Sequence, residues 1–141
     1  MIILILKNII MEDKNPLLYN GINIWWYWKT YFKNKNYRKV INTTSHQQLV
    51  LMSLKPKEEI GLEIHKNVDQ FIRIEKGTAL AIIGKENPKK YKLKKEYFIT
   101  IPAGTYHNII NTGRTDLKLY SIYSPPNHKP GTIQKTKPEN D

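Results

Sequence analysis

Two stretches of the chain carry the pattern that decides its fold, GLEIHKNVDQFIRIEKG at residues 61–77 and IPAGTYHNIIN at residues 101–111. In both, a short run rich in Ile and aromatic residues adjoins a glycine that predicts a turn. Runs of this kind recur about every 8–12 residues through the middle of the chain. We expect strands at 37–43, 46–54, 60–65, 68–75, 78–84, 90–93, 97–101, 106–110 and 116–123. This spacing favours an all-β fold, a small antiparallel β-barrel or jelly roll.

The composition on either side of this region predicts two arms. Residues 1–36 contain an aromatic cluster, which consists of Trp25, Trp26, Tyr27, Trp28, Tyr31 and Phe32. Its spacing suits a helix or a strand, and we interpret it as packing in a core or against a second subunit. Residues 125–141 are rich in proline, which is typical of a tail without a core of its own. We therefore expect an N-terminal arm at 1–36, a barrel at 37–124 and a tail at 125–141.

The charge of the chain first suggests a nucleic-acid-binding protein. It has 23 Lys and Arg residues against 12 Asp and Glu residues, a net charge of +11. Only Arg38, Arg73 and Arg114 are arginines, whereas recognition of phosphates and bases favours the planar Arg fork. Lys, Asn, Ile and Tyr are encoded by A/T-rich codons, so we attribute the charge mainly to genome composition and solubility. A nucleic-acid-associated protein remains the third function hypothesis.

Two features that the sequence lacks argue against cysteine-dependent sites and against a membrane or secreted protein. The chain has no cysteine, which excludes disulfide scaffolds, thiolate metal sites and cysteine nucleophiles. The apolar run at residues 1–10 is shorter than the roughly 20 residues of a membrane helix, and it lacks the features of a signal peptide. We therefore expect a cytoplasmic protein that acts away from membranes.

The residues able to carry chemistry gather in the two quoted stretches. Glu63 and His65 are two residues apart, so on a strand their side chains point into the same space. Gln70 follows in the next predicted strand, and His107 comes shortly after a tight turn. A lone histidine on a strand is more often a satisfied polar residue than a ligand, so the grouping matters more than any single member.

The spacing of these residues in the first stretch resembles the first short motif of the cupin superfamily. That motif is a Gly, five residues, His-x-His, three or four residues, Glu, six residues and a Gly. This chain has Glu63-x-His65, then Gln70 after four residues and Gly77 after six more. The positions of the leading His and of the motif's Glu are therefore occupied by Glu63 and Gln70.

The second stretch resembles the latter part of the second cupin motif. There the family has Pro-x-Gly, two residues, His, three residues and Asn, and this chain has Pro102, Gly104, His107 and Asn111. Over about residues 37–137 the sequence is similar to single-domain cupins of the mannose-6-phosphate-isomerase-like type. The resemblance implies that Gly77 and the motif's Pro, Gly and Asn have structural roles.

The resemblance also implies one divalent metal ion held by Glu63, His65, Gln70 and His107. Two histidines and a carboxylate suit Fe(II) with positions open to a ligand, and the absence of thiolates favours Fe, Mn, Ni or Zn. Relative to the family, the anionic ligand has moved from the fourth position to the first. Gln70 offers a neutral amide oxygen or hydrogen-bonds a bound water. The alternative is a cupin that kept the fold and lost the metal.

Other residues are weaker candidates for the pocket. Gln48 and Met52 share one face of the strand at 46–54, and Tyr120 and Tyr123 near the end of the last strand could reach the pocket mouth. His128 lies outside both motifs, and we interpret it as a surface histidine.

The first function hypothesis is a metal-dependent enzyme of the isomerase or dioxygenase type acting on a small polar molecule, with Glu63 as a candidate base. The alternative is a non-catalytic cupin that binds a sugar or another small ligand. Because small cupins commonly pair, the resemblance further implies a homodimer, with the aromatic arm as the candidate interface.

Overall fold

The structure is a computed structural model that describes residues 17–19, 22–24 and 27–139. The chain divides into two compact units, residues 1–33 and 34–141. In the first unit, β1 (Leu17–Tyr19) pairs antiparallel with β2 (Ile22–Ile24), and α2 (Tyr27–Lys33) follows. The predictions for residues 1–10 and for Trp25 and Trp26 lie outside the described residues. Within the described ranges, no helix is both long enough and apolar enough to cross a bilayer.

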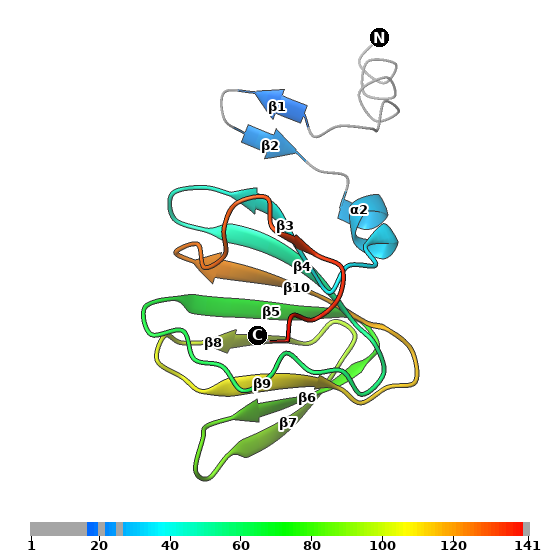
Figure 1. The fold of residues 1–141 in the computed structure, drawn as a ribbon, viewed down its shortest axis with the longest axis vertical. Coiled ribbons are helices and arrows are strands. Elements are labelled where there is room, and N and C mark those ends of the chain that lie inside the picture. The colour runs from blue at the N-terminus through cyan, green and yellow to red at the C-terminus, as the bar shows by residue number, and fades with distance from the viewer. Residues whose placement is uncertain (1–16, 20–21, 25–26, 140–141) are drawn as a thin grey trace. The chain divides into compact units, whose positions relative to one another are not determined.

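The second unit consists of two antiparallel sheets (Figure 1). The six-stranded sheet has the order β11-β3-β4-β10-β5-β8, and the three-stranded sheet has the order β7-β6-β9. Their strands are β3 (Arg38–Thr43), β4 (Gln48–Leu54), β5 (Asp69–Lys76), β6 (Thr78–Ile83), β7 (Lys89–Lys94), β8 (Phe98–Ile101), β9 (His107–Asn111), β10 (Leu117–Ser124) and β11 (Ile133–Gln134). The predicted all-β antiparallel fold is confirmed.

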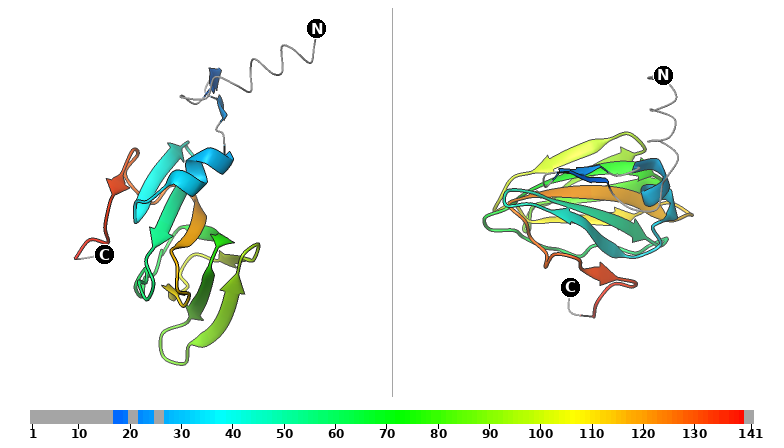
Figure 2. Two further views of the ribbon diagram at one scale, coloured as in Figure 1. Left: turned by 90° about the vertical axis from the view of Figure 1, so that its right-hand side faces the viewer. Right: turned by 90° about the horizontal axis from the view of Figure 1, so that it is seen from above.

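One apolar core fills the space between the two sheets, which face each other in Figure 2. Alternate residues of each strand point inward, and both sheets contribute to the core with Val50, Met52, Leu54, Ile72, Ile74, Ala79, Ala81, Ile109, Leu117 and Leu119 among others. Burying an aliphatic side chain of this size stabilises the fold by about 1.5–3 kcal/mol. Because side chains alternate with a period of two, this core fixes which residues of each strand face inward.

The inward-facing rows change from apolar to polar toward one end of the core. Tyr123 of β10 stands opposite Gln48 of β4 on one side and Gln70 of β5 on the other. These three side chains, together with His107 at the start of β9, are almost completely buried. Buried polar groups need partners to offset the loss of hydration, so this end of the core is where a functional site is expected.

The predicted strand at 60–65 is wrong as a continuous strand. The chain pairs with β9 only through isolated bridges, Glu59 with Ile110 and Glu63 with His107. Gly61 lies between them with a φ of 102°, a conformation that interrupts a regular strand and that glycine adopts most readily. The Glu63 bridge is nevertheless short on both sides, with backbone N–O distances of 2.9 and 3.0 Å. The two quoted stretches are therefore joined at Glu63 and His107.

The motif residues at the turns have structural partners. Asn111 is buried, and its amide group donates to the carbonyls of Leu54 and Thr115, both at 2.9 Å, while its Oδ1 accepts from the Gly113 N–H. Gly104 has a φ of 78°, and its N–H donates to the carbonyl of His65 at 2.8 Å. The second motif thereby holds the backbone of the first in place.

The C-terminal segment is anchored on the barrel although it has no core of its own. Its strand β11 pairs antiparallel with β3, with Gln134 opposite Arg38. The Arg38 guanidinium also donates to Oε1 of Gln134 at 2.6 Å. Between β10 and β11, the side-chain amide of Gln48 binds the backbone of His128, donating to its carbonyl at 2.7 Å and accepting from its N–H at 2.9 Å. The Gln48 side chain on β4 thus makes the two backbone hydrogen bonds that a neighbouring strand would otherwise make with His128.

Candidate metal centre

Three of the four predicted ligands converge from different parts of the chain. Oε1 of Glu63 lies 3.2 Å from Nε2 of His65 and 3.1 Å from Nε2 of His107. One ligand atom of each residue lies within 4.8 Å of the other two. Two of these residues sit on the segment before β5, and His107 opens β9, so the Glu63 bridge to β9 assembles the group.

Gln70 completes the cluster through a fixed amide orientation. Its side chain is fully buried, and its Nε2 donates to Oγ of Ser121 at 3.2 Å and to the hydroxyl of Tyr123 at 3.0 Å. With the amide nitrogen held there, Oε1 points toward the centre and lies 2.9 Å from Nε2 of His107. Gln70 therefore presents an oxygen lone pair to the same space as the other three residues.

The surroundings of His107 define which of its nitrogens carries hydrogen. Nδ1 lies 2.9 Å from the carbonyl oxygen of Thr105, which can only accept, so Nδ1 is the protonated nitrogen. Nε2 then directs a lone pair at Oε1 of Glu63 and Oε1 of Gln70, which are also acceptors. Three lone pairs that face one another at about 3 Å repel, unless a cation lies among them. Either a proton on Nε2 or a metal ion satisfies this arrangement.

The charge state of Glu63 suits a cation. Burial acts to raise the pKa of its carboxyl group, but hydrogen bonds with His107 and His65, together with the positive charge those rings can carry, lower the pKa to about 2. Glu63 is therefore ionised throughout the neutral pH range. The cluster offers one anionic and three neutral donors.

The donor set and its spacing fit a divalent metal ion. Ligands at right angles around an ion, with bonds of about 2.1 Å, lie about 3.0 Å apart. The three contacts at the centre measure 3.2, 3.1 and 2.9 Å. Imidazole nitrogen and carboxylate or amide oxygen are donors that Fe, Mn, Ni and Zn accept. Glu63, His65 and His107, with Gln70 as a fourth donor, could hold such an ion.

The side chain of Tyr123 contacts two of the candidate ligands, His65 and Gln70. Its ring packs edge-on against His65, with centroids 5.5 Å apart, and edge-on against His128 at 5.0 Å. The predicted surface role of His128 therefore needs correction, because its ring packs on this tyrosine and is partly covered. Burial raises the pKa of Tyr123 well above its usual range, and the nearby Glu63 charge raises it further. Tyr123 thus remains a neutral hydrogen-bonding partner of Gln70.

The three weaker pocket candidates lie in different surroundings. Gln48 is in the buried polar row, but its amide is bound to the tail. Met52 lies within the apolar core. Tyr120 lies on the opposite face of β10 from Tyr123, where its ring packs near Phe71 at 6.0 Å. Residues three apart on a strand face opposite sides, so Tyr120 and Tyr123 cannot both reach one pocket.

Comparisons with known proteins find close relatives of this chain. Residues 50–123 match the family model described as Cupin domain. An uncharacterized protein of Acanthamoeba polyphaga mimivirus is 59% identical over 108 residues, which cover 76% of this chain and 68% of that protein. The uncharacterized protein YrkC of Bacillus subtilis is 45% identical over 134 residues, 93% of this chain and 70% of that protein. A crystal structure of a Bacillus halodurans protein has a TM-score of 0.76 at 39% identity, covering 88% of this chain and 92% of that chain.

Proposed function

The chain belongs to the cupin domain family, and we propose that it is a metal-dependent enzyme of the isomerase or dioxygenase type that acts on a small polar molecule. The observation that carries the proposal is the convergence of unprotonated donor atoms at one point. Nδ1 of His107 donates its hydrogen bond to the Thr105 carbonyl, so Nε2 directs a lone pair at Oε1 of Glu63 and Oε1 of Gln70, 3.1 and 2.9 Å away. A divalent cation would satisfy all three of these lone pairs at once.

Some residues of the centre would bind the metal ion, and others orient those ligands. Bound here, a divalent Fe, Mn, Ni or Zn ion would polarise a carbonyl or hydroxyl oxygen of the ligand. Glu63 would supply the negative charge, and the two imidazoles would supply neutral donors. Tyr123 and Ser121 orient Gln70, and the carbonyl of Thr105 orients His107. Partners of this kind fix the direction of metal ligands and tune their basicity.

One observation favours the alternative of a non-catalytic small-ligand-binding cupin. Within the described part of the chain, the cluster contains a single carboxylate, Glu63. A carboxylate with a pKa of about 2 is a weak base at neutral pH, so Glu63 suits the role of ligand better than that of proton acceptor. At the position of the motif's glutamate, this chain has the neutral Gln70. A binding function needs no base and is compatible with the same donor set.

Metal analysis of the purified protein tests the proposal. We expect stoichiometric metal after purification under reducing, metal-replete conditions, and loss of that metal in Glu63→Ala and His107→Ala. His46→Ala is the matched control, because His46 is an exposed histidine outside the cluster and its removal should leave the metal content unchanged. A wild-type protein that retains no metal would overturn the proposal.

Enzyme and binder are separated by a screen of small polar molecules with the metal-loaded protein, with and without oxygen. Turnover by the wild type that is abolished in His107→Ala supports the enzyme. Saturable binding without turnover across the screen supports the alternative.

A further inference from the structure

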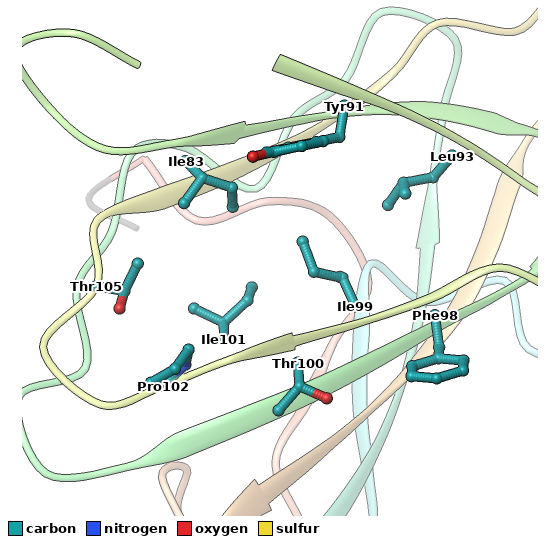
Figure 3. A pocket seen from close by; sticks show the side chains of 9 residues that line it. All are labelled: Ile83, Tyr91, Leu93, Phe98, Ile99, Thr100, Ile101, Pro102 and Thr105. Carbon is teal, nitrogen blue, oxygen red and sulfur yellow. The ribbon is translucent and has the colours of Figure 1, made fainter. Parts of the chain in front are cut away.

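An apolar pocket opens between the edge strands of the two sheets (Figure 3). Its volume is about 350 Å³, and its walls come from β7 and β6 on one side and from β8 on the other. The inner wall consists of Ile83, Leu93, Ile99 and Ile101, and Tyr91 stands across from β8, whereas the Phe98 side chain points away from the pocket and stacks on Phe71. None of Glu63, His65, Gln70 and His107 lines this pocket.

The size and exposure of the pocket suit a small ligand. Ligand pockets range from about 300 to 1,000 Å³, and a cavity of about 150 Å³ already accepts benzene. Tyr91, which stands over the pocket, is accessible from solvent at 47% exposure. Exposing the Tyr91 ring and the isoleucine wall of the pocket leaves apolar surface in water, which an apolar group in the pocket would cover.

The pocket adjoins the metal centre through three residues. Ile83 stands directly opposite His107 in the pairing of β6 with β9, and Ile101 stands directly opposite Gln70 in the pairing of β5 with β8. Directly opposed side chains on one face of a sheet have Cβ atoms about 4.5–5.5 Å apart. The third residue is Thr105, which lines the pocket while its carbonyl oxygen accepts from Nδ1 of His107. The pocket and the centre therefore share neighbouring side chains.

We propose that this pocket binds the apolar part, an aryl or branched alkyl group, of a ligand whose polar end binds at the metal centre. The inner isoleucines provide the apolar contacts, and the position of Ile83 and Ile101 beside two of the donors places the polar end next to the cation. The ligand class is thus a small carboxylate or carbonyl compound with an aryl or branched alkyl substituent. The polar half of this proposal rests on the proposed function, whereas the apolar half does not.

Methyl NMR of the isoleucines tests the apolar half on the metal-free protein. Toluene is the probe, and we expect its addition to shift the methyl signals of Ile83, Ile99 and Ile101. Ile122 is the internal control, because it lies on the outer face of β10 opposite Phe71 and outside the pocket. If the three pocket signals do not move, or move no more than that of Ile122, the pocket does not bind apolar groups. A dependence of the same signals on protein concentration without toluene would assign the pocket to a second copy and also overturn the proposal.

A pair of variants separates binding in the pocket from a general effect. Ile99→Phe should fill the pocket and abolish the toluene shifts, whereas Ile122→Phe makes the same substitution outside it and should preserve them. Cobalt(II) binding should be unchanged in both variants, which verifies that each has folded. Unaltered toluene binding in a folded Ile99→Phe protein would contradict the assignment.

The polar half is tested with 3-phenylpropionate on the protein loaded with cobalt(II). We expect this acid to bind at least about tenfold more tightly than toluene, and about tenfold more tightly than it binds the metal-free protein. Equal affinities would show that one ligand does not span the pocket and the centre. If the wild type binds no cobalt, the proposed function fails, and the toluene experiment still decides the role of the pocket.

Discussion

Replacing Tyr123 with Phe removes one hydroxyl group from beneath the candidate metal centre. The hydroxyl accepts a hydrogen bond of 3.0 Å from Nε2 of Gln70, and this bond helps to turn Oε1 of Gln70 toward His107. The ring remains, so the edge-on contacts with His65 and His128 are preserved. Tyr123→Phe therefore tests whether the orientation of Gln70 matters for the metal, apart from packing.

The expected effects follow from one lost acceptor in a buried site. Gln70 is fully buried, so one of its amide hydrogens loses its partner, at a cost of about 1–3 kcal/mol in the free energy of unfolding. Removing a partner that orients a metal ligand lowers metal affinity by about 10–100-fold. In free energy this is about 1.4–2.8 kcal/mol, similar in size to the stability loss. Both effects should therefore be measurable in the same variant.

Competition with a chromophoric chelator measures the metal affinity, and urea unfolding of the metal-free protein measures the stability. Tyr37→Phe is the matched control, because Tyr37 is also a buried tyrosine whose hydroxyl donates to a backbone carbonyl, that of Ile60 at 3.4 Å. Tyr37→Phe should lower stability by up to about 1 kcal/mol and leave the metal affinity unchanged. If Tyr123→Phe binds metal within about twofold of the wild type, Gln70 is not a ligand whose orientation matters.

The remaining predictions concern the turn, the tail and pH. Asn111→Ala should lower the free energy of unfolding by about 2–4 kcal/mol, because its side chain satisfies two backbone carbonyls and one N–H; urea titration measures this, and a loss below about 1 kcal/mol would count against the role. Gln48→Ala should speed amide hydrogen exchange across residues 127–134 with metal affinity unchanged, and exchange at the wild-type rate would show that the tail is held by other contacts. Glu63, with a pKa of about 2, should stay ionised down to about pH 3, so its carboxyl signal in NMR should titrate only below that pH; a midpoint near the ordinary value of about 4.3 would contradict the contacts with His65 and His107.

The strands were predictable because their patterns are local. The predicted strand at 68–75 differs from β5 (Asp69–Lys76) by one residue at each end, and the strand at 78–84 ends one residue beyond β6. Apolar residues at alternate positions, bounded by a turn such as that at Gly77, determine these limits. The segment at 60–65 has a similar composition but pairs with β9 only at isolated positions, and its backbone turns at Gly61.

The candidate site was partly predictable from spacing and partly not. Two motifs were enough to bring Glu63, His65 and His107 together, and the structure places their ligand atoms within 4.8 Å of one another. The role of Tyr123 depends on which face of β10 points inward, which the neighbouring strands determine. The partner of Gln48 is 80 residues away in the tail, and no local pattern signals so distant a contact. Orientation and long-range partners therefore required the structure.

The four donors of the centre do not belong to one sheet. Gln70 is on β5 of the six-stranded sheet, His107 is on β9 of the three-stranded sheet, and Glu63 and His65 lie on the segment that leads into β5. An ion held by all four would act as a cross-link between the layers and would resist their separation. At a free metal concentration of 100 times Kd, this linkage adds about 2.7 kcal/mol to the free energy of unfolding. The unfolding temperature of the protein would then depend on the free metal concentration in the cell.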